Sequence, residues 1–229
     1  MAVGAAEPSA PDRADHDLWW TVGRLTVGLV YRLVFRLRFV GLENVPSRGP
    51  ALLASNHISV LDPIGIALGP TGRGRTVRFL AAAEFFRRPV VGLGLRLIRQ
   101  IPIRRGESDV SALEEVASVI TRGALAGIFP EGGVSPDGSL RPGKRGAARI
   151  AMTGTVPLIP VGVWGTRARW PPEGPRFRGP LRPAVVVAYG PPVEAAGDPR
   201  CPNDVQALTE RLMAAVAREV ERARALAEG

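Results

Sequence analysis

The sequence has very few of the residues on which many enzyme classes depend. Its 229 residues include a single cysteine, Cys201, which excludes an internal disulfide and a four-cysteine zinc site and fits a reducing, cytosol-facing location. It has no serine or cysteine nucleophile motif such as Gly-x-Ser-x-Gly. The two histidines are His16, in a polar leader rich in Pro and Ala, and His57. In the body of the chain, His57 is therefore the one side chain of the type that exchanges protons near neutral pH.

Aromatic residues and negative charges are also scarce. Aromatic residues make up only 6% of the chain and are not interleaved with Arg and Gly, and no zinc-finger or recognition-helix signature occurs. We therefore expect no nucleic-acid partner. Because 30 Lys and Arg residues outnumber 21 Asp and Glu residues, the formal net charge is +9. This charge favours anionic partners such as phosphate-bearing substrates, a coenzyme or anionic lipid headgroups.

A long apolar run without charges is missing as well. Residues 18–40 are mostly apolar, but four arginines lie among them, which makes a transmembrane span unfavourable. On a helical projection the arginines share one side and apolar residues the other, which is typical of a helix in a membrane interface. The apolar side could equally pack against the protein's own core. We predict a flexible leader (1–17), an amphipathic membrane-associating helix (18–40) and a folded domain (41–229), with the protein peripheral or monotopic at the cytoplasmic face of a membrane.

Predicted strands alternate with predicted helices along the folded domain. Short apolar runs bounded by Gly, Pro or polar residues predict strands at 50–55, 76–81, 127–129, 158–163 and 184–189, and a strand with a turn at 39–46. Helical periodicity predicts helices at 110–122 and 203–227. The expected fold is α/β, a single domain with a mostly parallel central sheet flanked by helices.

His57 and Asp62 stand five positions apart, directly after the predicted strand at 50–55. Ligand sites in open α/β sheets lie at the carboxyl ends of strands, and Asn56 and Pro63 indicate a turn into a short helix. A neutral imidazole can take a proton from an attacking hydroxyl, while a carboxylate on its other nitrogen fixes the tautomer and stabilises the imidazolium. The pair is a candidate catalytic dyad. The structural alternative is a capping Asp beside a partly buried His.

Three further segments gain meaning in combination. The first segment, residues 84–106, carries Arg104 and Arg105 near its end. These arginines could bind phosphate or form a solvated surface. Residues 127–135 (Gly-Ile-Phe-Pro-Glu-Gly-Gly-Val-Ser) put an acid and flexible backbone N–H groups at the end of a strand, although alone they indicate only a turn. Residues 156–161 (Val-Pro-Leu-Ile-Pro-Val) indicate a buried strand.

In this order the four segments resemble the motifs of the glycerolipid acyltransferase family, typified by 1-acylglycerol-3-phosphate acyltransferase. Asn56-His57-x4-Asp62 matches the family's first motif in full, and residues 101–105 (Ile-Pro-Ile-Arg-Arg) match the second. Residues 129–132 (Phe-Pro-Glu-Gly) match the third motif and residues 156–160 the fourth. The resemblance runs from about residue 41 to residue 189, so the folded domain (41–229) is expected to be an acyltransferase domain.

The resemblance implies transfer of an acyl group from acyl-CoA or acyl carrier protein to the free hydroxyl of lysophosphatidate, giving phosphatidate. It implies no metal and no cofactor beyond the acyl donor as co-substrate, and its partners would be membrane lipids and a lysophospholipid acceptor. His57 would be the general base, oriented by Asp62, and the acceptor oxygen would attack the thioester directly. Substrate binding is implied for Asn56, Arg104, Arg105, Glu131, Gly132, Gly133, Ser135, Arg141 and Lys144.

One departure bears on the acceptor. The family's third motif usually continues Glu-Gly-Thr-Arg-Ser, whereas Gly133 and Val134 stand at the Thr and Arg positions here. Losing that phosphate contact costs on the order of a few kcal/mol of acceptor binding unless another cation replaces it, the candidates being Arg104, Arg141, Lys144 and Arg145. Two alternatives stay open: acylation of a different lysophospholipid or a glycolipid, and a non-catalytic lipid-binding protein of the same fold.

Overall fold

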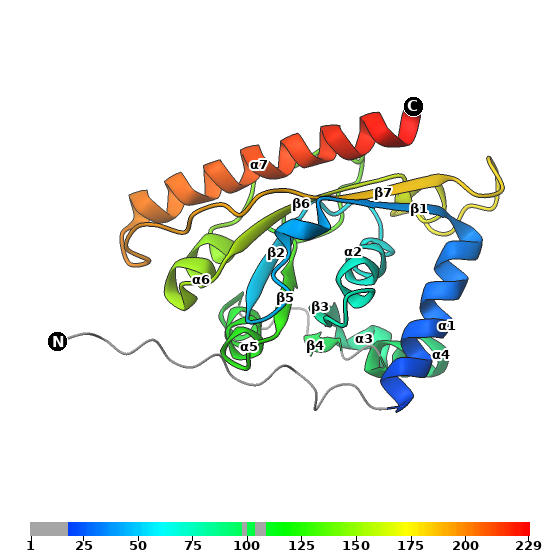
Figure 1. The fold of residues 1–229 in the computed structure, drawn as a ribbon, viewed down its shortest axis with the longest axis horizontal. Coiled ribbons are helices and arrows are strands. Elements are labelled where there is room, and N and C mark those ends of the chain that lie inside the picture. Colours follow the sequence, from blue (N-terminus) through cyan, green and yellow to red (C-terminus); the bar gives the residue numbers. More distant parts are fainter. Residues whose placement is uncertain (1–17, 98–99, 104–108) are drawn as a thin grey trace.

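A seven-stranded sheet forms the centre of the molecule. The computed structural model describes residues 18–97, 100–103 and 109–229, and its strands lie in the order β1-β7-β6-β2-β5-β3-β4 (Figure 1). The strands are β1 (Arg36–Val40), β2 (Ala51–Ser55), β3 (Val77–Ala82), β4 (Ile101–Ile103), β5 (Leu125–Ile128), β6 (Leu158–Trp164) and β7 (Ala184–Tyr189). The β6–β7 pair is antiparallel and the other paired strands are parallel. The predicted α/β fold with a mostly parallel sheet is confirmed.

Helices cover both faces of this sheet. They are α1 (Leu18–Val34), α2 (Asp62–Thr71), α3 (Ala83–Phe86), α4 (Pro89–Leu97), α5 (Asp109–Thr121), α6 (Gly146–Gly154) and α7 (Pro202–Glu228). The alternation of side chains along β2 shows the two layers, because successive strand residues point to opposite faces. Leu52 and Ala54 pack with α5, α6 and α7, whereas Ala51 and Leu53 pack with α1 and α2. In Figure 1, α7 runs across β6 and β7.

The predicted helix at 18–40 is too long at its carboxyl end. Helix α1 ends at Val34, and residues 36–40 form β1, which pairs in parallel with β7. The sequence Arg-Leu-Arg-Phe alternates polar and apolar residues, which suits a half-buried edge strand better than a helix. Phe35, which is 1% exposed, packs into the core between the two elements. Arg36 and Arg38 therefore lie on a strand.

Helix α1 has an inner and an outer side. Tyr31 is buried against the core, whereas five apolar residues are between 44% and 63% exposed: Val22, Leu25, Leu29, Val30 and Leu33. Part of the apolar stripe thus packs on the core, and part of it faces outward. Among the described residues, no helix has the length and apolar character needed to cross a membrane.

Candidate functional site

The candidate site lies where the carboxyl ends of β2, β5 and β6 meet. Asn56 follows β2 directly and is buried. Its amide nitrogen donates to the carbonyl of Val163 (3.0 Å), and its oxygen accepts from the backbone N–H of Val163 (2.8 Å). The side chain therefore continues the β2–β6 pairing one residue beyond the strand, and this fixes the point from which His57 leaves the sheet.

His57 and Asp62 form the predicted pair. Nδ1 of His57 lies 3.0 Å from Oδ2 of Asp62, which is the first residue of α2 and fully buried. The same oxygen accepts the backbone N–H groups of Ile58 (2.7 Å) and Ser59 (2.8 Å). Because a carboxylate accepts hydrogen bonds, this contact assigns the imidazole proton to Nδ1 and leaves Nε2 as the accepting nitrogen.

The side chain of Thr166 is also hydrogen-bonded to Asp62. The hydroxyl of Thr166, which is 0% exposed, donates to Oδ1 of Asp62 at 2.6 Å. Thr166 follows β6 by two residues and is 104 positions from Asp62 in the chain. The sequence analysis missed it. The available signal was its place just after the predicted strand at 158–163, since the ends of neighbouring parallel strands meet at one edge of the sheet.

Phe129 fixes the plane of the imidazole. Its ring stacks on that of His57, with centroids 3.8 Å apart and planes inclined by 11°. Phe129 in turn lies against Phe79, at a centroid distance of 5.3 Å. The side chain of His57 is 14% exposed, so it is reachable from solvent while its orientation is fixed from one face and one edge.

Glu131 binds main chain on both sides of the site. Its Oε1 accepts the backbone N–H of His57 (2.8 Å), and its Oε2 accepts the backbone N–H of Arg141 (3.0 Å). The Arg141 Nε lies 3.5 Å from Oε2, and the Glu131 side chain is fully buried. Ser135 holds the same loop from the other direction, because its backbone N–H donates to the carbonyl of His57 at 2.6 Å. The third motif thus holds the loop that carries His57.

The segment after Glu131 is surrounded by cations. The Arg141 guanidinium donates to the carbonyl of Gly133 (2.5 Å), and that of Arg167 donates to the carbonyls of Ser135 (3.2 Å) and Pro136 (2.6 Å). Gly132 has a φ of 76°, and a Cβ there would lie 2.9 Å from Nζ of Lys144. The turn therefore favours glycine at this position, and the lysine side chain passes close over it.

The remaining predicted site residues are Ser135, Arg104 and Arg105. The Ser135 hydroxyl is buried and donates to Asp137 (3.0 Å); hydrogen bonds from Ser139 and Ser135 lower the pKa of Asp137 to about 2. Arg104 and Arg105 lie outside the described residues. Among the described residues, no group of three or more His, Cys, Asp or Glu side chains is placed to hold a metal ion.

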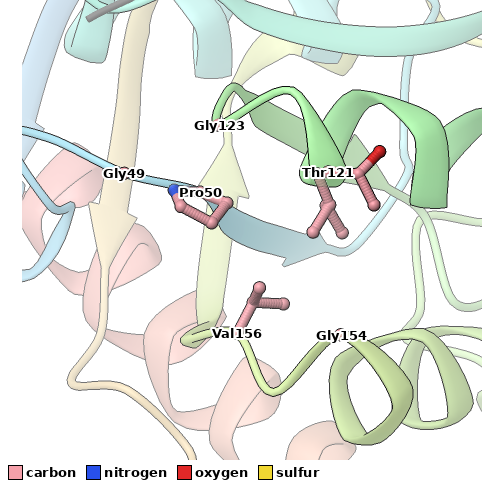
Figure 2. A pocket seen from close by; sticks show the side chains of 7 residues that line it. Gly49, Pro50, Thr121, Gly123, Gly154 and Val156 are labelled. Atoms are coloured by element: carbon pink, nitrogen blue, oxygen red, sulfur yellow. The ribbon is translucent and has the colours of Figure 1, made fainter. Parts of the chain in front are cut away.

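An open pocket lies at the opposite ends of the strands, away from the candidate site (Figure 2). Pro50 precedes β2 directly, and the other labelled residues are Gly49, Thr121, Gly123, Gly154 and Val156, which lie near the amino ends of β2, β5 and β6. Because His57 follows the carboxyl end of β2, this pocket is separated from the pair by the length of the strands. None of the predicted site residues that the structure describes lines it.

Comparison with known proteins gives one family. Residues 36–164 match the family described as Acyltransferase. The chain is 35% identical over 129 residues to "1-acyl-sn-glycerol-3-phosphate acyltransferase BAT2, chloroplastic" of Brassica napus, which covers 55% of this chain and 36% of that protein. It is 31% identical over 183 residues to "1-acyl-sn-glycerol-3-phosphate acyltransferase alpha" of Mus musculus, which covers 79% of this chain and 62% of that protein. The chain thus spans between about a third and two thirds of these relatives.

A solved structure is similar over most of the fold. The crystal structure of the 1-acyl-sn-glycerophosphate (LPA) acyltransferase PlsC from Thermotoga maritima superposes with a TM-score of 0.68 at 26% sequence identity. The similarity covers 90% of this chain and 80% of that one. The fold of the chain therefore has an architecture already seen in a solved acyltransferase.

Proposed function

Since the chain belongs to the acyltransferase family, which confirms the resemblance of its motifs, we propose that it transfers an acyl group from acyl-CoA or acyl carrier protein to the free hydroxyl of lysophosphatidate. The product is phosphatidate, and the names of the relatives support this choice of acceptor. The observation that supports the activity best is the His57–Asp62 pair at the end of β2, with Thr166 holding the far oxygen of the carboxylate.

The proposed reaction proceeds without an acyl-enzyme. Nε2 of His57 takes the proton of the acceptor hydroxyl as its oxygen attacks the thioester carbonyl carbon. The tetrahedral intermediate collapses and the C–S bond breaks, and the leaving thiolate takes the proton back from the imidazolium. Asp62 stabilises that imidazolium through Nδ1, and its three further hydrogen bonds prevent it from turning away.

We propose that Arg141 and Lys144 replace the arginine missing from the third motif. Both lie against the Gly132–Gly133 turn, directly before Val134, which occupies the position of the motif arginine. An amine or guanidinium at this turn supplies the charge-assisted contact that a lysophosphatidate phosphate needs. Arg104 and Arg105 are proposed as further phosphate ligands from the resemblance alone. Glu131 has both carboxylate oxygens engaged by main-chain N–H groups, so we propose that it holds the His57 loop rather than the acceptor.

We also propose that the outer side of α1 lies in a membrane interface on the cytoplasmic side. Its exposed residues Leu25, Leu29 and Leu33 follow a four-residue spacing, so they form one stripe along the helix. A lysophospholipid acceptor is itself a component of such an interface. An enzyme that docks there meets its substrate without extracting it through water.

The experiment is an acceptor panel. The purified full chain in detergent is supplied with oleoyl-CoA and, separately, lysophosphatidate, lysophosphatidylcholine, lysophosphatidylglycerol, a monoacyl glycolipid or no acceptor, and products are identified by mass spectrometry. Phosphatidate as the main product supports the proposal. A different acylated lipid would assign the Gly133–Val134 departure to a change of acceptor. No product with any acceptor, and none with acyl carrier protein as donor, would contradict the proposed activity and favour lipid binding without turnover.

A further inference from the structure

The connection between β6 and β7 (residues 165–183) carries the two most exposed large apolar side chains among the described residues. Phe177 and Leu181 are each 89% exposed. Other exposed large apolar residues of the described chain range from 40% to 63%. A single exposed apolar side chain is ordinary on a protein surface. Two of them within one short segment, residues 176–182 (the tip of the connection), favour contact with an environment less polar than water.

Hydrogen bonds hold this tip in its shape. The guanidinium of Arg169 donates to the carbonyls of Arg178 (3.2 Å), Pro180 and Leu181 (2.8 Å). The backbone N–H of Arg176 donates back to the carbonyl of Arg169 at 2.8 Å. The connection is therefore closed on itself by the Arg169 side chain and by one main-chain hydrogen bond, rather than by packing of Phe177 or Leu181.

Arginines flank the exposed apolar pair, and one of them, Arg176, is also paired with Glu173 (3.4 Å). Arg176, Arg178 and Arg182 are next to Phe177 or Leu181 in the chain and are exposed. Arg182 also donates to the carbonyls of Arg32 (2.5 Å) and Phe35 (3.3 Å), at the carboxyl end of α1. The connection therefore adjoins the carboxyl end of α1, and in Figure 1 the yellow connection before β7 lies on the same side of the molecule as α1. Exposed apolar residues with neighbouring arginines complement anionic lipid headgroups above an acyl layer.

We propose that the tip formed by residues 176–182 is a second contact with an anionic phospholipid bilayer, beside α1. Phe177 and Leu181 enter the boundary between headgroups and acyl chains, and the flanking arginines bind lipid phosphates. This inference rests on the proposed function, because it assigns a further part of the chain to the membrane on which the acceptor is found.

The same connection is hydrogen-bonded to the segment that carries His57 and Asp62 (residues 57–62). Thr166, near its start, donates to Asp62 (2.6 Å), and the hydroxyl of Ser59 donates to the carbonyl of Trp170 (2.6 Å). Docking of the tip therefore determines where His57 stands relative to the bilayer. A contact through α1 alone would leave rotation about the helix axis open, whereas two contacts define which edge of the sheet faces the lipid.

The test is co-sedimentation of the full-length protein with vesicles of phosphatidylcholine and phosphatidylglycerol, and with vesicles of phosphatidylcholine alone. The double variant Phe177→Ser with Leu181→Ser is expected to partition about tenfold or more weakly to the mixed vesicles, because two apolar side chains no longer leave water. Arg178→Glu is expected to weaken partitioning to the mixed vesicles by about tenfold or more. Its matched control, Arg218→Glu on α7, makes the same charge change on an exposed site of another element and is expected to change partitioning by less than about twofold.

Wild-type partitioning by the Phe177/Leu181 variant would overturn the proposal, and so would equal losses for Arg178→Glu and Arg218→Glu, which would indicate a response to net charge only. Activity toward detergent-dispersed lysophosphatidate separates this inference from the proposed function. The tip variants are expected to keep the wild-type rate in detergent and to lose activity on vesicle-embedded acceptor. If the wild-type protein shows no transfer, the proposed function fails while the vesicle comparison still decides whether the tip binds lipid.

Discussion

Replacing Thr166 by Val removes one hydroxyl and little else. The change deletes the 2.6 Å hydrogen bond to Oδ1 of Asp62 and leaves that buried carboxylate with one donor fewer. A hydrogen bond to a charged group contributes about 1.5–3 kcal/mol, which is equivalent to about tenfold to a hundredfold in a rate if it is expressed in the transition state. In the proposed mechanism the developing imidazolium needs an oriented Asp62, so we expect kcat to fall by about tenfold or more. Thr166 is fully buried and does not reach the substrate, so KM should change little.

Two variants make this prediction specific to the pair. Thr166→Ser keeps the hydroxyl and should retain most of kcat. Thr209→Val removes another buried hydroxyl, which donates to the carbonyl of Val205 within α7 at 2.7 Å, and it should affect the free energy of unfolding without affecting kcat. The assay is steady-state release of CoA thiol, with urea denaturation of each variant alongside. A wild-type kcat for Thr166→Val, or an equal fall for Thr209→Val, would refute the role given to Thr166.

Three further changes test the loop, the acceptor contact and α1. Glu131→Gln turns an amide NH₂ toward one of the two main-chain N–H groups that now donate to the carboxylate. We expect the free energy of unfolding, measured by urea denaturation, to fall by about 1–3 kcal/mol and kcat to fall as well. Unchanged values of both would contradict the role given to Glu131. Lys144→Met should raise KM for lysophosphatidate by about tenfold while KM for oleoyl-CoA stays near wild type; equal effects on both substrates would remove the lysine from the acceptor site. Leu29→Ser with Leu33→Ser should weaken vesicle binding without lowering the melting temperature, since both side chains are exposed, and a lowered melting temperature with unchanged binding would show that they pack instead.

Much of the sheet was predictable because its strands are local signals. The run of residues 184–189 is apolar and rich in Val, follows a proline and ends before glycine and proline, and it forms β7 with the predicted bounds. The strand predicted at 158–163 is β6 with one residue added. The carboxyl-terminal helix runs over Pro202–Glu228, one residue beyond each predicted end. In each case the periodicity and its flanking breakers lie in one continuous stretch.

The end of α1 depended on a partner far away in the chain. Residues 36–40 form a strand because β7, almost 150 residues later, offers an edge to pair with. Within residues 18–40 alone, an apolar stripe with arginines fits a continuous helix equally well. Strand β4 was not predicted; its three residues pair with β3, and a proline within so short a run is unfavourable for a strand in the absence of such a partner.

The contact between His57 and Asp62 was predictable from the sequence, and the residues that support it were less so. The spacing of His57 and Asp62 identified a pair that is indeed in contact. The partners of Thr166 and Glu131 could not be derived, because they lie 104 and 74 positions away and depend on how three strand ends meet. A motif shows that an acid is present, but only the fold shows whether its oxygens face a substrate or the main chain.

The most direct test of the account is acceptor-dependent release of CoA thiol by the wild-type protein and by His57→Ala, in detergent, with oleoyl-CoA and lysophosphatidate. If His57 is the general base, the rate of acyl transfer by the variant should be lower by about 10²-fold or more. Its affinity for lysophosphatidate, measured by equilibrium dialysis, should stay close to that of the wild-type protein. Transfer by His57→Ala at a rate near that of the wild-type protein would contradict the central claim, because the base would then be another group.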